Sequence, residues 1–206
     1  MSSSELEATV ERGLVLGRQS GNAFITQHLE MVRWMNIARS KDAAEAANPL
    51  AQLARAPLPT VAGTAQSNVA YALIAAGDLA GAERAAKEGL AKSTGMTVLE
   101  AQAHAVLAAV HMASGRLQDA LAAADSALAL PVMGFPRHLD ECELIRAEAL
   151  MAIGRSEDAH EAIQVARAHV LGTAESLDDE DRSSYLTQVR ASVRILGLAS
   201  EWLGDV

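Results

Sequence analysis

Hydrophobic and polar positions recur with the period of an α-helix along nearly the whole chain. Apolar residues stand three and four positions apart in many windows, for example Val69, Ala70, Leu73 and Ile74, or Leu107, Ala108 and Met112. No stretch of four or more residues alternates convincingly between apolar and polar, and β-branched residues are sparse. We therefore expect an all-α protein.

The chain contains an internal repeat in which an alanine follows a glycine by five positions. Three clear copies and one weaker copy are present: AGDLAGAE at 76–83, SGRLQDAL at 114–121, IGRSEDAH at 153–160 and ARSKDAAE at 38–45. Their anchors, Arg39, Gly77, Gly115 and Gly154, are separated by 38, 38 and 39 residues. The alanines that follow are Ala44, Ala82, Ala120 and Ala159. Near-constant spacing of this kind predicts a repeat architecture.

Each repeat is a pair of helices joined by a glycine turn. Glycine adopts the left-handed conformation that ends a helix at low cost. The alanine opens the second helix, where a small side chain allows two helices to pack closely. One face of each pair is apolar, and only the next pair can cover it, so we expect the pairs to stack as a solenoid.

The pattern divides residues 1–206 as a single repeat domain. A leading helix at 4–20 begins with a Ser4/Glu7 capping-box signature. Helix pairs follow at 22–55, 64–93, 96–130 and 137–171, and a terminal helix covers 182–203. The acidic stretch 175–181 is expected to be a loop or an N-terminal cap for that last helix.

This repeat resembles the tetratricopeptide repeat. The resemblance rests on the three glycine–alanine pairs and on the small residues Ala70, Ala108 and Ala147, seven positions before each glycine. The chain departs from the family in its longer repeat, in Arg39 where a glycine is usual, and in aliphatic residues or His104 and His111 at aromatic positions. The long repeat is similar to the arrays of bacterial signalling ATPases and LuxR-type activators. The family implies a right-handed superhelix of antiparallel helix pairs.

The resemblance also implies a concave groove lined by the first helix of each pair. Family geometry places these residues on it: Leu29, Arg33, Asn36, Ser67, Tyr71, Ile74, Ala105, Ala109, Met112, Leu144, Glu148 and Met151. Of these residues, the ones expected to bind a ligand are Arg33, Asn36, Tyr71, Ile74, Met112, Leu144, Glu148 and Met151. Either the methionines and Ile74 only fill gaps between helices, or they line a channel for a peptide or a partner helix. A single cation among these positions argues against a clamp for carboxylate termini.

Catalytic and metal-binding signatures are absent from the sequence. It contains no phosphate-binding glycine loop, no nucleophile elbow and no zinc-binding histidine motif. His138 and Cys142 share a helix face, but two residues do not make a metal site or an activated nucleophile. We therefore expect a protein that is not an enzyme and that needs no cofactor or metal.

The overall charge and hydropathy exclude other partners. A formal net charge of −9 argues against nucleic acid, and no apolar run is long enough for a membrane span. A single cysteine is typical of a reducing compartment, so we expect a cytoplasmic protein.

Both termini correspond to half-repeats. They are either capping helices or the ends of a fragment of a longer protein. Leu14, Leu16, Leu198 and Trp202 are then expected to form apolar edges that promote self-association. The sequence favours a scaffold that binds a protein or peptide partner; the alternative is a regulatory domain of a bacterial transcription activator or signalling ATPase.

Overall fold

The computed structural model describes residues 3–38, 43–131 and 137–204. Helices make up 85% of the structure, and the described part of the chain contains no strand. The prediction of an all-α protein is therefore confirmed. Arg39, the anchor of the weakest repeat, lies outside the described residues, as do the side chains of Ser4 and His138.

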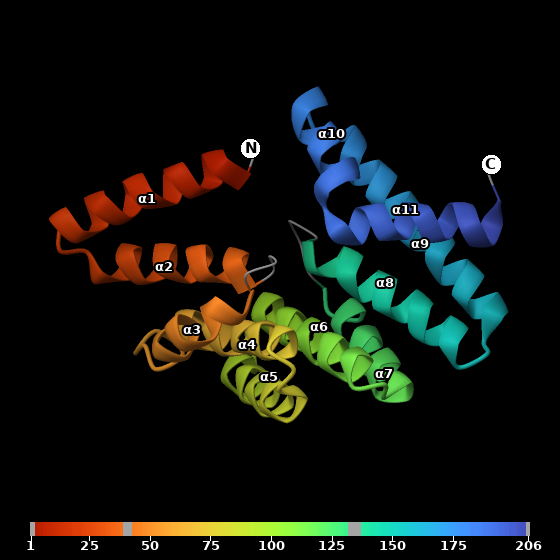
Figure 1. The fold of residues 1–206 in the computed structure, drawn as a ribbon, viewed down its shortest axis with the longest axis horizontal. Helices are drawn as coiled ribbons and strands as arrows, with labels where there is room; N and C mark the ends of the chain where they lie inside the picture. The colour runs from red at the N-terminus through yellow and green to blue at the C-terminus, as the bar shows by residue number, and fades with distance from the viewer. Residues whose placement is uncertain (1–2, 39–42, 132–136, 205–206) are drawn as a thin grey trace.

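The helices follow one another as a curved row of antiparallel pairs (Figure 1). Their bounds are α1 Ser3–Gln19, α2 Ala23–Ala38, the 3-10 helix η1 Ala43–Ala46, α3 Ala47–Leu53, α4 Pro59–Ala75, α5 Leu79–Ser93, α6 Thr97–Ala113, α7 Leu117–Leu128, α8 Arg137–Ala152, α9 Ser156–Glu175, α10 Asp179–Gln188 and α11 Arg190–Leu203. Among the described residues α1 makes no contact with α10 or α11, so the row does not close into a bundle.

Three differences from the predicted bounds bear on the architecture. α4 begins at Pro59, before the predicted residue 64, because proline is well suited to the first turn of a helix. The second helix of the first pair is divided into η1 and the short α3. The predicted terminal helix is two helices, because Val189 has extended backbone angles (φ −78°, ψ 111°) between α10 and α11.

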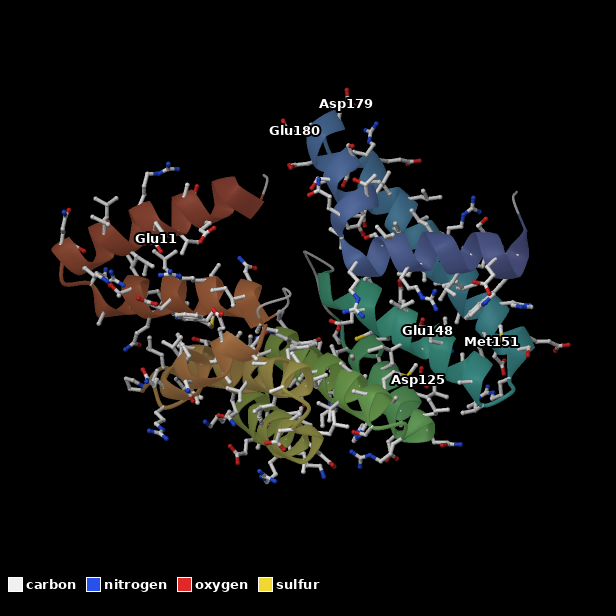
Figure 2. All side chains as sticks on the ribbon, in the orientation of Figure 1. Glu11, Asp125, Glu148, Met151, Asp179 and Glu180 are labelled. Atoms are coloured by element: carbon white, nitrogen blue, oxygen red, sulfur yellow. The ribbon has the colours of Figure 1, made fainter. Side chains whose placement is uncertain are left out.

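The acidic stretch forms the start of α10. Asp178 caps this helix, since its Oδ1 accepts a hydrogen bond from the backbone N–H of Asp181 at 2.9 Å. Asp179 and Glu180 lie exposed at the tip of α10 (Figure 2). Three carboxylates in a first turn stabilise the positive end of the helix dipole, as the sequence predicts.

The repeated glycines end the first helix of each pair in the predicted way. Gly77, Gly115 and Gly154 have φ of +79°, +69° and +83°. At the first turn the N–H of Gly77 donates to the carbonyl of Ile74 and the N–H of Asp78 donates to that of Leu73, both at 3.0 Å. The same two bonds recur at the other two turns, so all three are Schellman motifs.

Small residues fill the seam between the helices of a pair. Ala82, Ala120 and Ala159 are fully buried, as predicted. Gly89 allows an even closer approach, because a Cβ there would lie 2.9 Å from the backbone nitrogen of Ser67 and 3.0 Å from its Cα. Ser67 is therefore buried against α5, and its predicted position on the groove face is wrong.

First helices form one layer and second helices form another. α2 contacts α4, α4 contacts α6 and α6 contacts α8. Within the described residues α5 does not contact α7, and α7 does not contact α9. Along the row each second helix also contacts the first helix of the next pair, α5 with α6 and α7 with α8. We call the layer of first helices the inner face and the layer of second helices the outer face.

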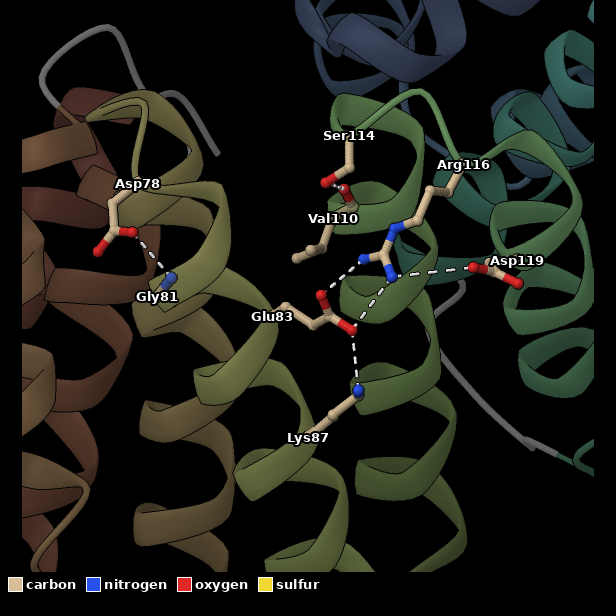
Figure 3. A network of polar contacts seen from close by, with 8 residues as sticks. All are labelled: Asp78, Gly81, Glu83, Lys87, Val110, Ser114, Arg116 and Asp119. Atoms are coloured by element: carbon tan, nitrogen blue, oxygen red, sulfur yellow. Dashed lines mark hydrogen bonds and ion pairs between the residues drawn. The ribbon is translucent and has the colours of Figure 1, made fainter.

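Charged side chains join the second and third repeats on the outer side (Figure 3). Both carboxylate oxygens of Glu83 on α5 accept hydrogen bonds from the guanidinium of Arg116, at 2.7 and 3.2 Å. Lys87 lies 2.8 Å from the same carboxylate. Hydrogen bonds from Arg116 and then from Lys87 lower the pKa of Glu83 to about 2.

A first prediction concerns the closest seam. Gly89→Ala forces its new methyl against the Ser67 backbone and should lower the free energy of unfolding by about 1–3 kcal/mol. Gly172→Ala in α9 is the matched control, because a Cβ at Gly172 meets no atom within 4 Å. It should stabilise the protein by about 0.5–1 kcal/mol, since alanine is the better helix former. Equal effects of the two variants in denaturant unfolding would contradict the close contact.

A second prediction concerns pH. Because the folded pKa of Glu83 lies below its ordinary value of 4.5, its ion pairs stabilise the protein above that value and lose this effect as the pH falls towards 2. Glu83→Gln should destabilise the protein near neutral pH by less than about 1 kcal/mol, since the ion pairs are partly exposed. The difference from the parent protein should shrink between pH 4.5 and 2. A difference that stays constant over this range in thermal unfolding would show that the charge of Glu83 is not responsible.

Candidate functional site

The candidate site is the inner face formed by α2, α4, α6 and α8. All eight residues predicted to bind a ligand are half-buried: Arg33, Asn36, Tyr71, Ile74, Met112, Leu144, Glu148 and Met151. Each is therefore partly covered by the protein and also retains exposed surface. The structure divides them into three groups along the row.

The middle group consists of Tyr71, Ile74 and Met112 on α4 and α6. All three pack against the larger hydrophobic core, which extends from α2 to α8. The hydroxyl of Tyr71 donates a hydrogen bond to Oε2 of Glu141 on α8 at 2.6 Å. This bond passes over the intervening α6 and joins two first helices that are not neighbours in the row.

The first group, Arg33 and Asn36, lies on α2 near the start of the row. The guanidinium of Arg33 forms an ion pair with Glu11 on α1 at 2.8 Å, and it lies 5.4 Å from the centre of the Trp34 ring. Figure 2 shows Glu11 on α1, facing α2. The charge of Arg33 is thus already compensated within the chain.

The third group, Leu144, Glu148 and Met151, lies on α8 where α11 packs. Leu144 and Met151 belong to a second hydrophobic core that includes Ile195 and Leu198 of α11. Oε1 of Glu148 accepts a hydrogen bond from Nε of Arg194 at 2.9 Å. The last helix of the chain therefore covers part of the predicted groove at this end.

The terminal helices expose less apolar surface than the half-repeat interpretation predicted. Leu14 and Leu198 are almost completely buried, so the expectation that they form open apolar edges is wrong. Leu14 is buried where α1 packs along α2, and Leu198 is buried in the second core. Leu16 is 66% exposed, and Val15, Phe24 and Ile25 are exposed near it. Trp202 is half-buried.

Carboxylates of α8 connect it to several other helices, which the sequence did not reveal. Oδ2 of the buried Asp140 accepts a hydrogen bond from the hydroxyl of Tyr185 on α10 at 2.6 Å. Oε1 of Glu143, also buried, contacts Nδ1 of His169 on α9. Burial raises the pKa of both carboxyls and, together with the bond to Asp140, raises the pKa of Tyr185 to about 12. The only signal in the sequence is three acidic residues within four positions of one helix.

The described residues offer little for covalent or metal chemistry. Cys142 is fully buried, and burial raises the pKa of its thiol, which suppresses the reactive thiolate. No group of three or more potential metal ligands occurs among the residues that the structure describes. None of the helices in that part of the chain combines the length and apolarity of a membrane span.

A third prediction compares the two tyrosines. Tyr185→Phe leaves the carboxylate of Asp140, only 2% exposed, without its hydroxyl donor, and should cost about 1.5–3 kcal/mol of stability. Tyr71→Phe removes a similar bond from the half-buried Glu141, which water can still reach, and should cost about 0.5–1.5 kcal/mol. Chemical denaturation measures both. A larger loss for Tyr71→Phe would contradict the difference in burial.

Comparison with known proteins identified no relative. No protein-family model, no curated protein sequence and no solved structure matches the chain. The resemblance to tetratricopeptide repeats therefore rests on the repeat residues themselves.

Proposed function

We propose that the chain is a non-enzymatic scaffold that binds a peptide or a partner helix along its inner face. The proposal includes a tetratricopeptide-like superhelix, in which the first helices line the concave side. The observation that carries it is the partial exposure of all eight inner-face residues, combined with the compensated charges at both ends of this face.

The exposed surface of the middle group favours an apolar ligand. Tyr71 contributes a rigid ring whose hydroxyl is held by Glu141, so binding would not have to order it. Ile74 and Met112 are apolar, and the thioether of methionine adapts to ligands of different shape.

The charged ends of the face are less important for recognition than the sequence suggested. The two charged residues among the eight are Arg33 and Glu148. Because Glu11 and Arg194 already neutralise them, a ligand has to replace these ion pairs before it can use either charge. We therefore place the main contact area on α4 and α6, with Leu144 and Met151 next to α11 as its boundary.

The test is a selection from a randomised peptide library displayed on phage, followed by titration of the selected peptides. Met112→Glu places a charge in the proposed contact area and should weaken binding by about tenfold or more. Tyr71→Ala removes the ring and should weaken binding to a similar degree. Ala122→Glu is the matched control, because Ala122 is exposed on the outer helix α7.

Circular dichroism first establishes that all three variants remain folded. Selected peptides that bind Met112→Glu and the parent protein equally, but bind Ala122→Glu weakly, would contradict an inner-face site.

A further inference from the structure

A cavity between α7, α8 and α9 lies apart from the inner face. Its volume is about 320 Å³. Its lining consists of Leu128, Ala129, Ala162 and Val165, together with the charged residues Asp125, Glu143 and Arg146. At 100° per residue, Arg146 points about 160° away from the inner-face residues Leu144 and Glu148 on α8. The cavity therefore opens on the side of the second helices.

The charges in this cavity do not cancel completely. Nε of Arg146 lies 2.8 Å from Oδ1 of Asp125, so these two side chains neutralise each other. Glu143 is 6% exposed, and its Oε1 contacts His169. Its Oε2 is buried and has no hydrogen-bond partner within the described structure. A buried carboxylate oxygen without a donor is costly, because it has lost its hydration and gained nothing in return.

The shape and chemistry of the cavity favour one class of ligand. The side chains of Leu128, Ala162 and Val165 provide apolar walls for an alkyl chain, and Val165 is exposed at the rim. A cationic head group would supply the missing donor to Glu143. Because His169 already contacts Oε1, only Oε2 lacks a donor, which favours a compact ammonium over a guanidinium that binds both oxygens.

The overall charge of the chain supports a cation. The net charge of −9 attracts cations during encounter and disfavours anionic ligands.

We propose that this cavity binds the primary ammonium group of an unbranched alkyl chain, with Glu143 as the acceptor. The group belongs either to a lysine side chain of a partner protein or to a free alkylamine. This site is separate from the inner face and does not depend on a ligand there.

The experiment is an NMR titration of the full chain with labelled alanine and valine methyl groups, at low salt and near neutral pH. In one arm the probe is 1-pentylamine, with 1-pentanol as its neutral counterpart. In the other arm the probe is a capped Gly-Lys-Gly peptide, with norleucine replacing lysine in its counterpart. The methyl resonances of Ala162 and Val165 should shift saturably with an amine and about tenfold more weakly with its neutral counterpart.

Two variants assign the effect to Glu143. Glu143→Gln should weaken amine binding by about tenfold, because the amide offers no negative charge. Glu157→Gln, at an exposed position of α9 outside the cavity, should leave amine binding unchanged. Binding of the lysine peptide assigns the site to a partner's side chain, and binding of pentylamine alone assigns it to a free amine. The proposal is overturned if neither amine causes a saturable shift or if Glu143→Gln binds as the parent protein does.

Discussion

The close approach of the two helices within each pair is the constraint on which the rest of the structure depends. Only 3% of the residues are aromatic, so large side chains cannot fill wide spaces between helices. Fully buried alanines at the start of three second helices (Ala82, Ala120 and Ala159), and Gly89 against the Ser67 backbone, bring the helices together instead. Because one face of each first helix is taken up by this contact, the other faces pack against the neighbouring pairs or form the inner face.

Helix α8 then links the two halves of the row. Its carboxylates accept hydrogen bonds from Tyr71 on α4, Tyr185 on α10 and Arg194 on α11, and its Arg146 bonds to Asp125 on α7. Two separate hydrophobic cores lie on either side of this junction. The hydrogen bonds of α8 thus fix the position of the exposed middle of the inner face relative to the end that α11 covers.

Local features of this structure could be predicted from the sequence, and contacts between distant residues could not. The positive φ of Gly77 and the burial of Ala82 follow from the repeat, because helix ends and seams depend on nearby residues. Ser67 was misplaced because its backbone lies directly against Gly89 of α5, in the seam between the two helices. The bond between Tyr71 and Glu141 joins residues 70 positions apart, and no periodic pattern reports such a contact. Glu143 was missed for the same reason. The burial of its Oε2 without a hydrogen-bond donor depends on how three helices pack together.

The central claim is that the middle of the inner face contacts the partner. Methyl NMR of the methionines tests it without any substitution, because the chain has only seven of them and Met112 lies in the proposed contact area. On titration with a library-selected peptide, the Met112 resonance should shift saturably, with the same midpoint as binding measured by calorimetry. A peptide that binds by calorimetry while the Met112 resonance stays unchanged would contradict the account.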